Sequence, residues 1–133
     1  MNRCVVVADD DPNVIKLVQL RLGMAQYDVV ATNDAIAAMA MVRARTPAAV
    51  ILDVQMPGGG GLSVLAKIKS DPQLSGLPVM MLTGERNAET VMEAMSSGAD
   101  DYMVKPFIPD VLAQRVTRLV DRGGKAPAAT WEI

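Results

Sequence analysis

Short apolar runs alternate with amphipathic stretches along the chain. The apolar runs are rich in Val, Ile, Leu and Met and are bounded by Gly, Pro, Asn or Asp, which predicts strands over residues 4–8, 27–31, 48–52, 78–82 and 102–104. Helical spacing and capping residues predict helices over residues 12–23, 34–45, 62–70, 87–97 and 110–122. Five strand–helix units of similar length indicate an α/β domain with a parallel sheet covered on both faces.

Local signals predict several of the boundaries between these elements. Asp11 is expected to cap the first helix, with Pro12 at its first position, and Asn33 to cap the second. Pro47 prevents the second helix from continuing. The run Gly58–Gly61 lacks the Gly-Lys-Ser/Thr ending of a phosphate-binding P-loop, so we expect it to form a mobile loop.

Length and charge restrict the class of protein. The 133 residues allow one domain, which we place at residues 1–122, and residues 123–133 read as a flexible tail or the start of an interdomain linker. The formal net charge is −2, and Lys and Arg are dispersed, so we expect no direct binding to nucleic acid or membranes. No run approaches the ~20 apolar residues that span a bilayer, and a cytoplasmic protein is expected.

Individual residue types narrow the chemistry further. Cys4 is the only cysteine, and its apolar neighbours predict a buried small side chain. Aliphatic residues and the ten Met are expected to fill the core, because aromatic residues are few. The chain has no histidine, which excludes imidazole metal sites and Ser-His triads, so any phosphohistidine would have to come from a partner.

Polar residues suited to phosphate and Mg²⁺ follow the predicted strands. Asp9 and Asp10 follow the first strand, Asp53 the third, Thr83 the fourth and Lys105 the fifth. The carboxyl ends of parallel strands form the ligand crevice of such sheets, and a divalent cation relieves the repulsion between clustered carboxylates. Each residue alone has a plainer explanation, such as helix capping for the aspartates, a strand position for Thr83 or a surface position for Lys105. Their joint placement favours a metal-assisted phosphoryl site.

Four segments in this order carry a resemblance to a known family. They are Val5–Pro12, Ile51–Pro57, Pro78–Gly84 and Gly98–Phe107. Together they resemble the receiver domain of bacterial two-component response regulators over about residues 3–122. The resemblance implies a flavodoxin-like fold of five strand–helix units, with a doubly wound five-stranded parallel sheet of strand order 2-1-3-4-5.

The resemblance also assigns roles to the acidic residues. It makes Asp53 the phosphoryl acceptor and Asp10 a direct ligand of Mg²⁺, with Asp9 acting mainly through water. The main-chain carbonyl of Gln55 would complete the protein ligands of the metal. A carboxylate that accepts a phosphoryl group forms a mixed anhydride, which water then hydrolyses.

Further roles follow from the same resemblance. Lys105 would pair with Asp53 and later with the phosphoryl group, the peptide bond between Lys105 and Pro106 would be cis, and the Thr83 hydroxyl would donate to a phosphoryl oxygen. Tyr102 matches the aromatic switch residue of the family, which moves inward when the hydroxyl at the Thr83 position turns toward phosphate. Gln55 and Glu85, each two residues beyond a site residue, are expected to set the lifetime of the phosphorylated state.

These assignments predict a signalling switch that catalyses only its own phosphorylation and dephosphorylation. The expected donor is a cognate histidine kinase or phosphotransfer protein. An effector or output domain would read the surface formed by residues 87–97, 102–104 and 110–122, where a phosphorylation-dependent dimer is also expected. Two alternatives remain open: a haloacid dehalogenase-like phosphohydrolase with Asp9 as nucleophile, because Asp9 and Asp11 have Asp-x-Asp spacing, and a phosphorylation-independent interaction domain.

Overall fold

Five short apolar runs pair into a single parallel sheet. In the computed structural model, which describes residues 2–122, the strand order is β2-β1-β3-β4-β5, the order that the family resemblance implied. The strands are β1 (Cys4–Ala8), β2 (Asp28–Thr32), β3 (Ala49–Leu52), β4 (Val79–Thr83) and β5 (Asp101–Val104). The helices are α1 (Pro12–Met24), α2 (Ala35–Arg45), α3 (Gly60–Ser70), α4 (Ala88–Ser96) and α5 (Pro109–Arg122).

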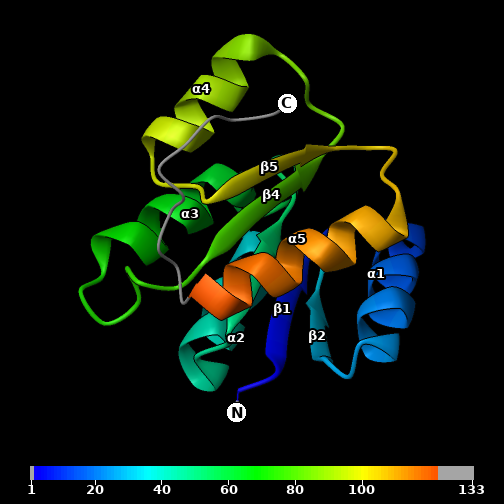
Figure 1. The fold of residues 1–133 in the computed structure, drawn as a ribbon. Coiled ribbons are helices and arrows are strands. Elements are labelled where there is room, and N and C mark those ends of the chain that lie inside the picture. The colour runs from blue at the N-terminus through cyan, green and yellow to red at the C-terminus, as the bar shows by residue number, and fades with distance from the viewer. Residues whose placement is uncertain (1, 123–133) are drawn as a thin grey trace.

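Helices cover both faces of the sheet, as the five strand–helix units predicted (Figure 1). Alternate residues of β1 belong to two separate apolar clusters, since successive side chains of a strand point to opposite faces. Val5 and Val7 pack in the cluster that contains residues of α1 and α5, whereas Val6 and Ala8 pack in the cluster of α2, α3 and α4. Both faces are therefore buried, which explains why the central strands read as continuous apolar runs. None of the helices in the described residues is long and apolar enough to cross a membrane.

The pairing register brings the carboxyl ends of four strands together. Ala8 of β1 pairs with Leu52 of β3, so the residues that follow, Asp9 and Asp53, lie next to each other at the edge of the sheet. The ladder continues beyond the strands, because the Asp53 N–H donates to the Ala8 carbonyl at 3.0 Å. The Lys105 N–H likewise donates to the Thr83 carbonyl at 2.8 Å. These main-chain bonds hold the polar residues at one edge.

Helix capping agrees with the sequence for α1 and differs for α2. The Asp11 carboxylate caps α1 by accepting the Asn13 N–H at 2.9 Å, as expected. The cap of α2 is Asp34, whose carboxylate accepts the Ala37 N–H at 2.7 Å, so the prediction of Asn33 was wrong by one residue. Adjacent Asn and Asp are both good caps, and only the backbone path decides between them.

Tyr27 lies just outside the strand predicted for it. Its N–H donates to the Leu22 carbonyl and helps to close α1, so β2 starts one residue later. The ring is buried with its hydroxyl 2.8 Å from the Thr117 Oγ1 atom of α5, and the Arg3 guanidinium lies 3.9 Å from the ring centroid. Tyr27 therefore ties the loop between α1 and β2 to α5.

The second half of the glycine run belongs to α3 rather than to a loop. Gly58, Gly59 and Gly60 have φ values of +85°, +114° and +79°, which side chains rarely adopt, and α3 begins at Gly60. A Cβ atom on Gly61 would collide with the carbonyl oxygen of Asp53. The run thus lets the start of α3 approach the end of β3.

Some core assignments also need correction. Cys4 is only partly buried, because it is the first residue of β1, and its burial raises the pKa of the thiol. Met24 and Met92 are each 70% exposed on helix surfaces, so the Met residues are not all core residues. The predicted tail, residues 123–133, lies outside the described residues.

Candidate functional site

Three carboxylates meet at the carboxyl edge of the sheet. Asp9, Asp10 and Asp53 each present an oxygen, and these oxygens lie within 4.8 Å of one another. Asp9 and Asp53 are buried, with 2% and 6% of their surfaces exposed, while Asp10 is exposed to solvent. Carboxylates this close repel one another, which makes the cluster suited to a cation.

Lys105 supplies positive charge inside this cluster. Its Nζ atom lies 2.6 Å from Asp9 Oδ2 and 3.0 Å from Asp53 Oδ2. The Lys105–Pro106 peptide bond that follows the lysine is cis. One ammonium thus bridges the two buried carboxylates from β1 and β3, and it reaches them from the end of β5.

Burial and charge oppose each other at this bridge. Burial raises the pKa of Asp9 above its ordinary value, although hydrogen bonds from Lys105 and from the Asp11 N–H act in the opposite direction. Burial alone would lower the pKa of Lys105, but its hydrogen bonds to Asp9 and Asp53 outweigh that effect, and its pKa is raised. Lys105 is therefore a firmly protonated cation at neutral pH.

The remaining predicted site residues form a chain of hydrogen bonds beside Asp53. The Gln55 N–H donates to Asp53 Oδ1 at 3.1 Å, and the Gln55 side-chain amide donates to Glu85 Oε2 at 3.1 Å. The Glu85 N–H donates to Thr83 Oγ1 at 3.3 Å, and the Tyr102 hydroxyl donates to the Glu85 carbonyl at 2.6 Å. Thr83 still has its own hydroxyl proton to donate, since Oγ1 acts as the acceptor in that bond. The loops after β3 and β4 are thereby linked directly at the site.

The donor set of the cluster fits a hard divalent cation. Mg²⁺ and Ca²⁺ prefer oxygen ligands, and Mg²⁺ sites in proteins often use one or two carboxylates. Asp9 already accepts the Asp11 N–H on one oxygen and Lys105 on the other. The exposed Asp10 carboxylate has no hydrogen bond to any side chain or backbone group among residues 2–122. Both Asp53 oxygens are likewise engaged, by the Gln55 N–H and by Lys105. Asp10 is therefore the carboxylate best placed for a direct bond to a metal.

Two glycines shape the surroundings of Asp53. A Cβ atom on Gly84 would have no heavy atom within 4 Å, so the space beside the end of β4 is open. Gly61 packs directly against the Asp53 backbone, and it had not been singled out among the candidate residues. The sequence contained an indication of this close packing, because a run of four glycines begins soon after a predicted strand ends at a polar residue.

A second acid–base pair lies away from this cluster. Asp100 is buried, and its Oδ2 accepts the Val79 N–H at 2.8 Å and lies 3.2 Å from Lys69 Nζ. Lys69 also donates to the Leu77 carbonyl at 2.8 Å. Because these groups satisfy one another, the pair holds the loops before β4 and β5 together and has a structural explanation.

Comparisons with known proteins agree with the fold. The response regulator receiver domain family matches residues 5–117. The chain is 34% identical, over its full length and 57% of the relative, to the DNA-binding response regulator MtrA of Mycolicibacterium smegmatis. It is also 34% identical, over 94% of the chain and 52% of the relative, to the DNA-binding dual master transcriptional regulator RpaA of Synechocystis. The chain thus spans about half the length of these relatives.

Solved structures give the same result. The receiver domain of the Francisella response regulator 1452 superposes with a TM-score of 0.83 at 30% identity, covering 91% of this chain and 98% of that one. The family match and this solved structure place the chain in the class of signal receivers. The chain belongs to the response regulator receiver domain family of two-component systems.

Proposed function

We propose that this receiver is switched by transfer of a phosphoryl group to Asp53. The observation that carries the proposal is the position of the Asp53 carboxylate, which lies in a cluster with Asp9 and Asp10 and is bound by the ammonium of Lys105. The open space at Gly84 supports access for a donor. Membership of the response regulator receiver domain family supports a phosphohistidine donor on a partner, either a histidine kinase or a phosphotransfer protein.

The proposed step is an in-line displacement at phosphorus. A carboxylate oxygen of Asp53 forms a new P–O bond while the bond between phosphorus and the donor breaks, and the donor leaves with the bonding electron pair. Lys105 stabilises the negative phosphoryl oxygens, and the Thr83 hydroxyl donates a hydrogen bond to one of them. Water later attacks phosphorus, restoring the Asp53 carboxylate and releasing inorganic phosphate.

Mg²⁺ fits the donor set as the accompanying metal ion. We propose that Asp10, Asp53 and the Gln55 main-chain carbonyl hold it directly, and that Asp9 acts mainly through water. When bound, Mg²⁺ would neutralise charge on the phosphoryl oxygens. Two observations support Asp10 over Asp9 as a direct ligand: the oxygens of Asp9 are engaged by Lys105 and the Asp11 N–H, and Asp10 is exposed. The proposed bond to Asp53 is supported by the place of its carboxylate in the cluster.

Family membership argues against the phosphohydrolase that would use Asp9 as its nucleophile. We propose instead a signalling domain whose chemistry is confined to its own phosphorylation and dephosphorylation. The other alternative is a phosphorylation-independent interaction domain. It differs from the proposed function in that Asp53 would accept no phosphoryl group.

The readout is proposed to lie on the surface of α4, β5 and α5. Tyr102 of β5 supports this direction, because its hydroxyl contacts the Glu85 carbonyl next to Thr83. An effector, an output domain or a second receiver would recognise that surface. The names of the two relatives, MtrA and RpaA, describe those full-length proteins as DNA-binding. We do not propose DNA binding for this chain. A cytoplasmic location stays a prediction.

The test is chemical labelling with acetyl phosphate and Mg²⁺. Mass spectrometry should detect one added phosphoryl group, and borohydride reduction with peptide mapping should place it on Asp53. The Asp53→Asn variant should lose the label. Asp28→Asn is the matched control, since Asp28 is an exposed carboxylate at the opposite end of the sheet, and it should retain full labelling.

Each alternative has its own outcome in this experiment. Labelling on Asp9 would support the phosphohydrolase chemistry. A folded protein that acquires no label from acetyl phosphate or from phosphoramidate would support the phosphorylation-independent interaction domain. Either result would refute Asp53 as the acceptor.

A further inference from the structure

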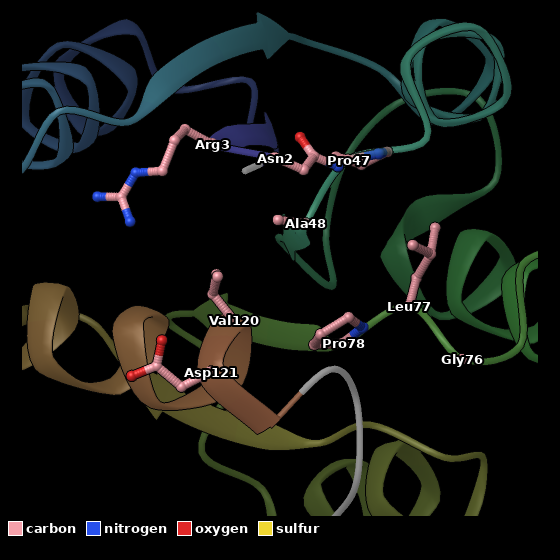
Figure 2. Close-up of a pocket in the computed structure, with 9 residues that line it drawn as sticks. All are labelled: Asn2, Arg3, Pro47, Ala48, Gly76, Leu77, Pro78, Val120 and Asp121. Carbon is pink, nitrogen blue, oxygen red and sulfur yellow. The ribbon is translucent and has the colours of Figure 1, made fainter.

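The amino edge of the sheet, opposite the acidic cluster, contains a pocket of about 430 Å³. It lies among the segments that precede β1, β3 and β4 and the last turn of α5 (Figure 2). Its volume is within the ~300–1,000 Å³ range of pockets that hold small ligands. The proposed phosphoryl chemistry uses none of its residues.

The walls of this amino-edge pocket are apolar and its rim is charged. Pro47, Pro78 and Val120 contribute rings and an aliphatic side chain, and Val120 points from α5 toward the segment before β3 in Figure 2. Arg3 and Asp121 supply one charge of each sign. Within residues 2–122, neither of these two residues has an ion-pair partner within 4.0 Å. The Arg3 guanidinium donates hydrogen bonds to the main-chain carbonyls of Ala25 and Gln26.

This lining fits an aromatic side chain that carries a polar group. Tryptophan has a large apolar ring system and one N–H donor, which usually finds an acceptor when the ring is buried. The Asp121 carboxylate is such an acceptor at the rim. The Arg3 guanidinium already lies over the Tyr27 ring, and a cation of this kind also attracts a neighbouring acidic group.

We propose that the amino-edge pocket is a binding site for the indole of Trp131 from the chain's own carboxyl-terminal segment. Asp121, which lines the pocket, directly precedes Arg122, the last residue that the structure describes. The nine residues from Gly123 to Trp131 can span up to about 30 Å when extended, which is enough for the chain to turn back to the pocket.

The composition of the segment supports this occupant. Gly123 and Gly124 permit the backbone conformations that a reversal of direction requires. Trp131 is the only tryptophan in a chain with few aromatic residues, and Glu132 beside it has the charge that complements Arg3. Because the indole is tethered next to its site, binding is intramolecular and needs little intrinsic affinity.

The single tryptophan makes the proposal directly measurable. In the 133-residue protein, Trp131 should emit at a shorter wavelength than N-acetyltryptophanamide and should be quenched several-fold less efficiently by acrylamide. Nuclear Overhauser contacts should connect the indole protons to the methyl groups of Leu77 and Val120. Protection should not change when the protein is diluted, since the site and the indole belong to one chain.

A filled pocket provides the decisive variant. Gly76 lines the pocket and a Cβ atom there would have nothing within 4 Å, so Gly76→Phe places a ring in open space and should expose Trp131. Gly23→Phe is the matched control, because Gly23 also has nothing within 4 Å and lies on α1, away from the pocket. Gly76→Ala adds only a methyl group and should preserve the protection.

Several results would overturn the proposal. Trp131 in the wild-type protein could be quenched as efficiently as the free amide, with no contacts to Leu77 or Val120. Protection could persist in a folded Gly76→Phe variant, which would place the indole elsewhere. Protection that disappears on dilution would assign the pocket to the tail of a second copy. The wild-type measurements decide the question even if Gly76→Phe does not fold.

Discussion

The Tyr102 hydroxyl donates a hydrogen bond to the main-chain carbonyl of Glu85 at 2.6 Å. Tyr102 is 3% exposed, so its ring is buried. Burial, together with the nearby negative charge of Glu85, raises the pKa of Tyr102 above its ordinary value, so the hydroxyl remains a donor at neutral pH. The bond joins β5 to the loop after β4, which also carries the contact to Thr83.

We predict that beryllofluoride, a phosphoryl mimic, changes this region as well as the Asp53 pocket. A new partner for the Thr83 hydroxyl should weaken its contact with the Glu85 N–H and alter the loop that Tyr102 holds. Backbone amide shifts from Thr83 through Lys105 to α5 should move. If shifts remain confined to residues around Asp53, Tyr102 is not a switch.

We predict that Asp10→Asn weakens Mg²⁺ binding more than Asp9→Asn. The Asp9 oxygens are occupied by Lys105 and the Asp11 N–H, whereas Asp10 is exposed and available. A loss on the order of tenfold or more is expected for Asp10→Asn, since even groups that only orient metal ligands contribute about 10–100-fold. Calorimetric titration with Mg²⁺ measures both variants, with Asp28→Asn as the control. Equal affinities in the wild type and Asp10→Asn would refute the assignment of Asp10.

We predict that Gln55 and Glu85 act as a pair on the lifetime of the phosphorylated state. Their side chains are hydrogen-bonded at 3.1 Å and join the loops beside Asp53. Gln55→Ala and Glu85→Ala should each change the autodephosphorylation rate, and the double variant should differ from the sum of the two because the residues are in contact. Phosphate release from the labelled protein gives the rates. Unchanged rates in both single variants would remove these residues from the mechanism, and additive effects would remove the coupling.

We predict opposite effects of alanine at two glycines. Gly61→Ala should lower the free energy of unfolding by about 1–3 kcal/mol, because the new methyl group meets the Asp53 carbonyl and must displace the start of α3. Gly23→Ala has open space in α1 and should raise the free energy of unfolding by about 0.4–1 kcal/mol. Urea denaturation measures both. If both variants are equally stable, the close packing of α3 on Asp53 has no energetic consequence.

We predict that Asp101→Asn stabilises the protein at neutral pH and not at low pH. Burial raises the pKa of Asp101 above its ordinary 3.8, despite the opposing charge of Arg115. The pKa of Asp101 is therefore higher in the folded protein than in the unfolded chain. At a pH above the folded-state pKa, the ionised carboxylate lowers the free energy of unfolding. At a pH below the unfolded-state pKa, the carboxyl group is protonated in both states and this destabilisation disappears. Asparagine keeps an oxygen acceptor for the Tyr102 N–H and for Arg115.

Urea midpoints measured from pH 7 down to pH 3 test this sign. The advantage of Asp101→Asn should shrink as the pH falls through the folded pKa of Asp101. Asp110→Asn is the control, since that carboxylate pairs with Arg21 at the surface and is 77% exposed. A variant that is less stable than the wild type at pH 7 would show that the ion pair with Arg115 outweighs the cost of burial.

The sequence by itself determined the strands, the helices and the edge at which the polar residues gather. A strand buried on both faces has to be apolar along its whole length, so Asp9, Asp53 and Lys105 can occur only where a strand ends. Capping residues and prolines bounded the helices to within one or two positions. The choice between Asn33 and Asp34 was the exception, because neighbouring residues with similar side chains produce the same signal.

Only the tertiary structure decided which of these groups touch. Periodicity identifies strands and says nothing about their neighbours, so the order β2-β1-β3-β4-β5 rested on a resemblance until the pairing was seen. The bridge from Lys105 to both Asp9 and Asp53, and the contact between Gln55 and Glu85, join residues that are 30 to 96 positions apart. The amino-edge pocket likewise forms from four separate segments. Such contacts depend on how helices pack on the sheet, and packing is a property of the folded chain rather than of any local pattern.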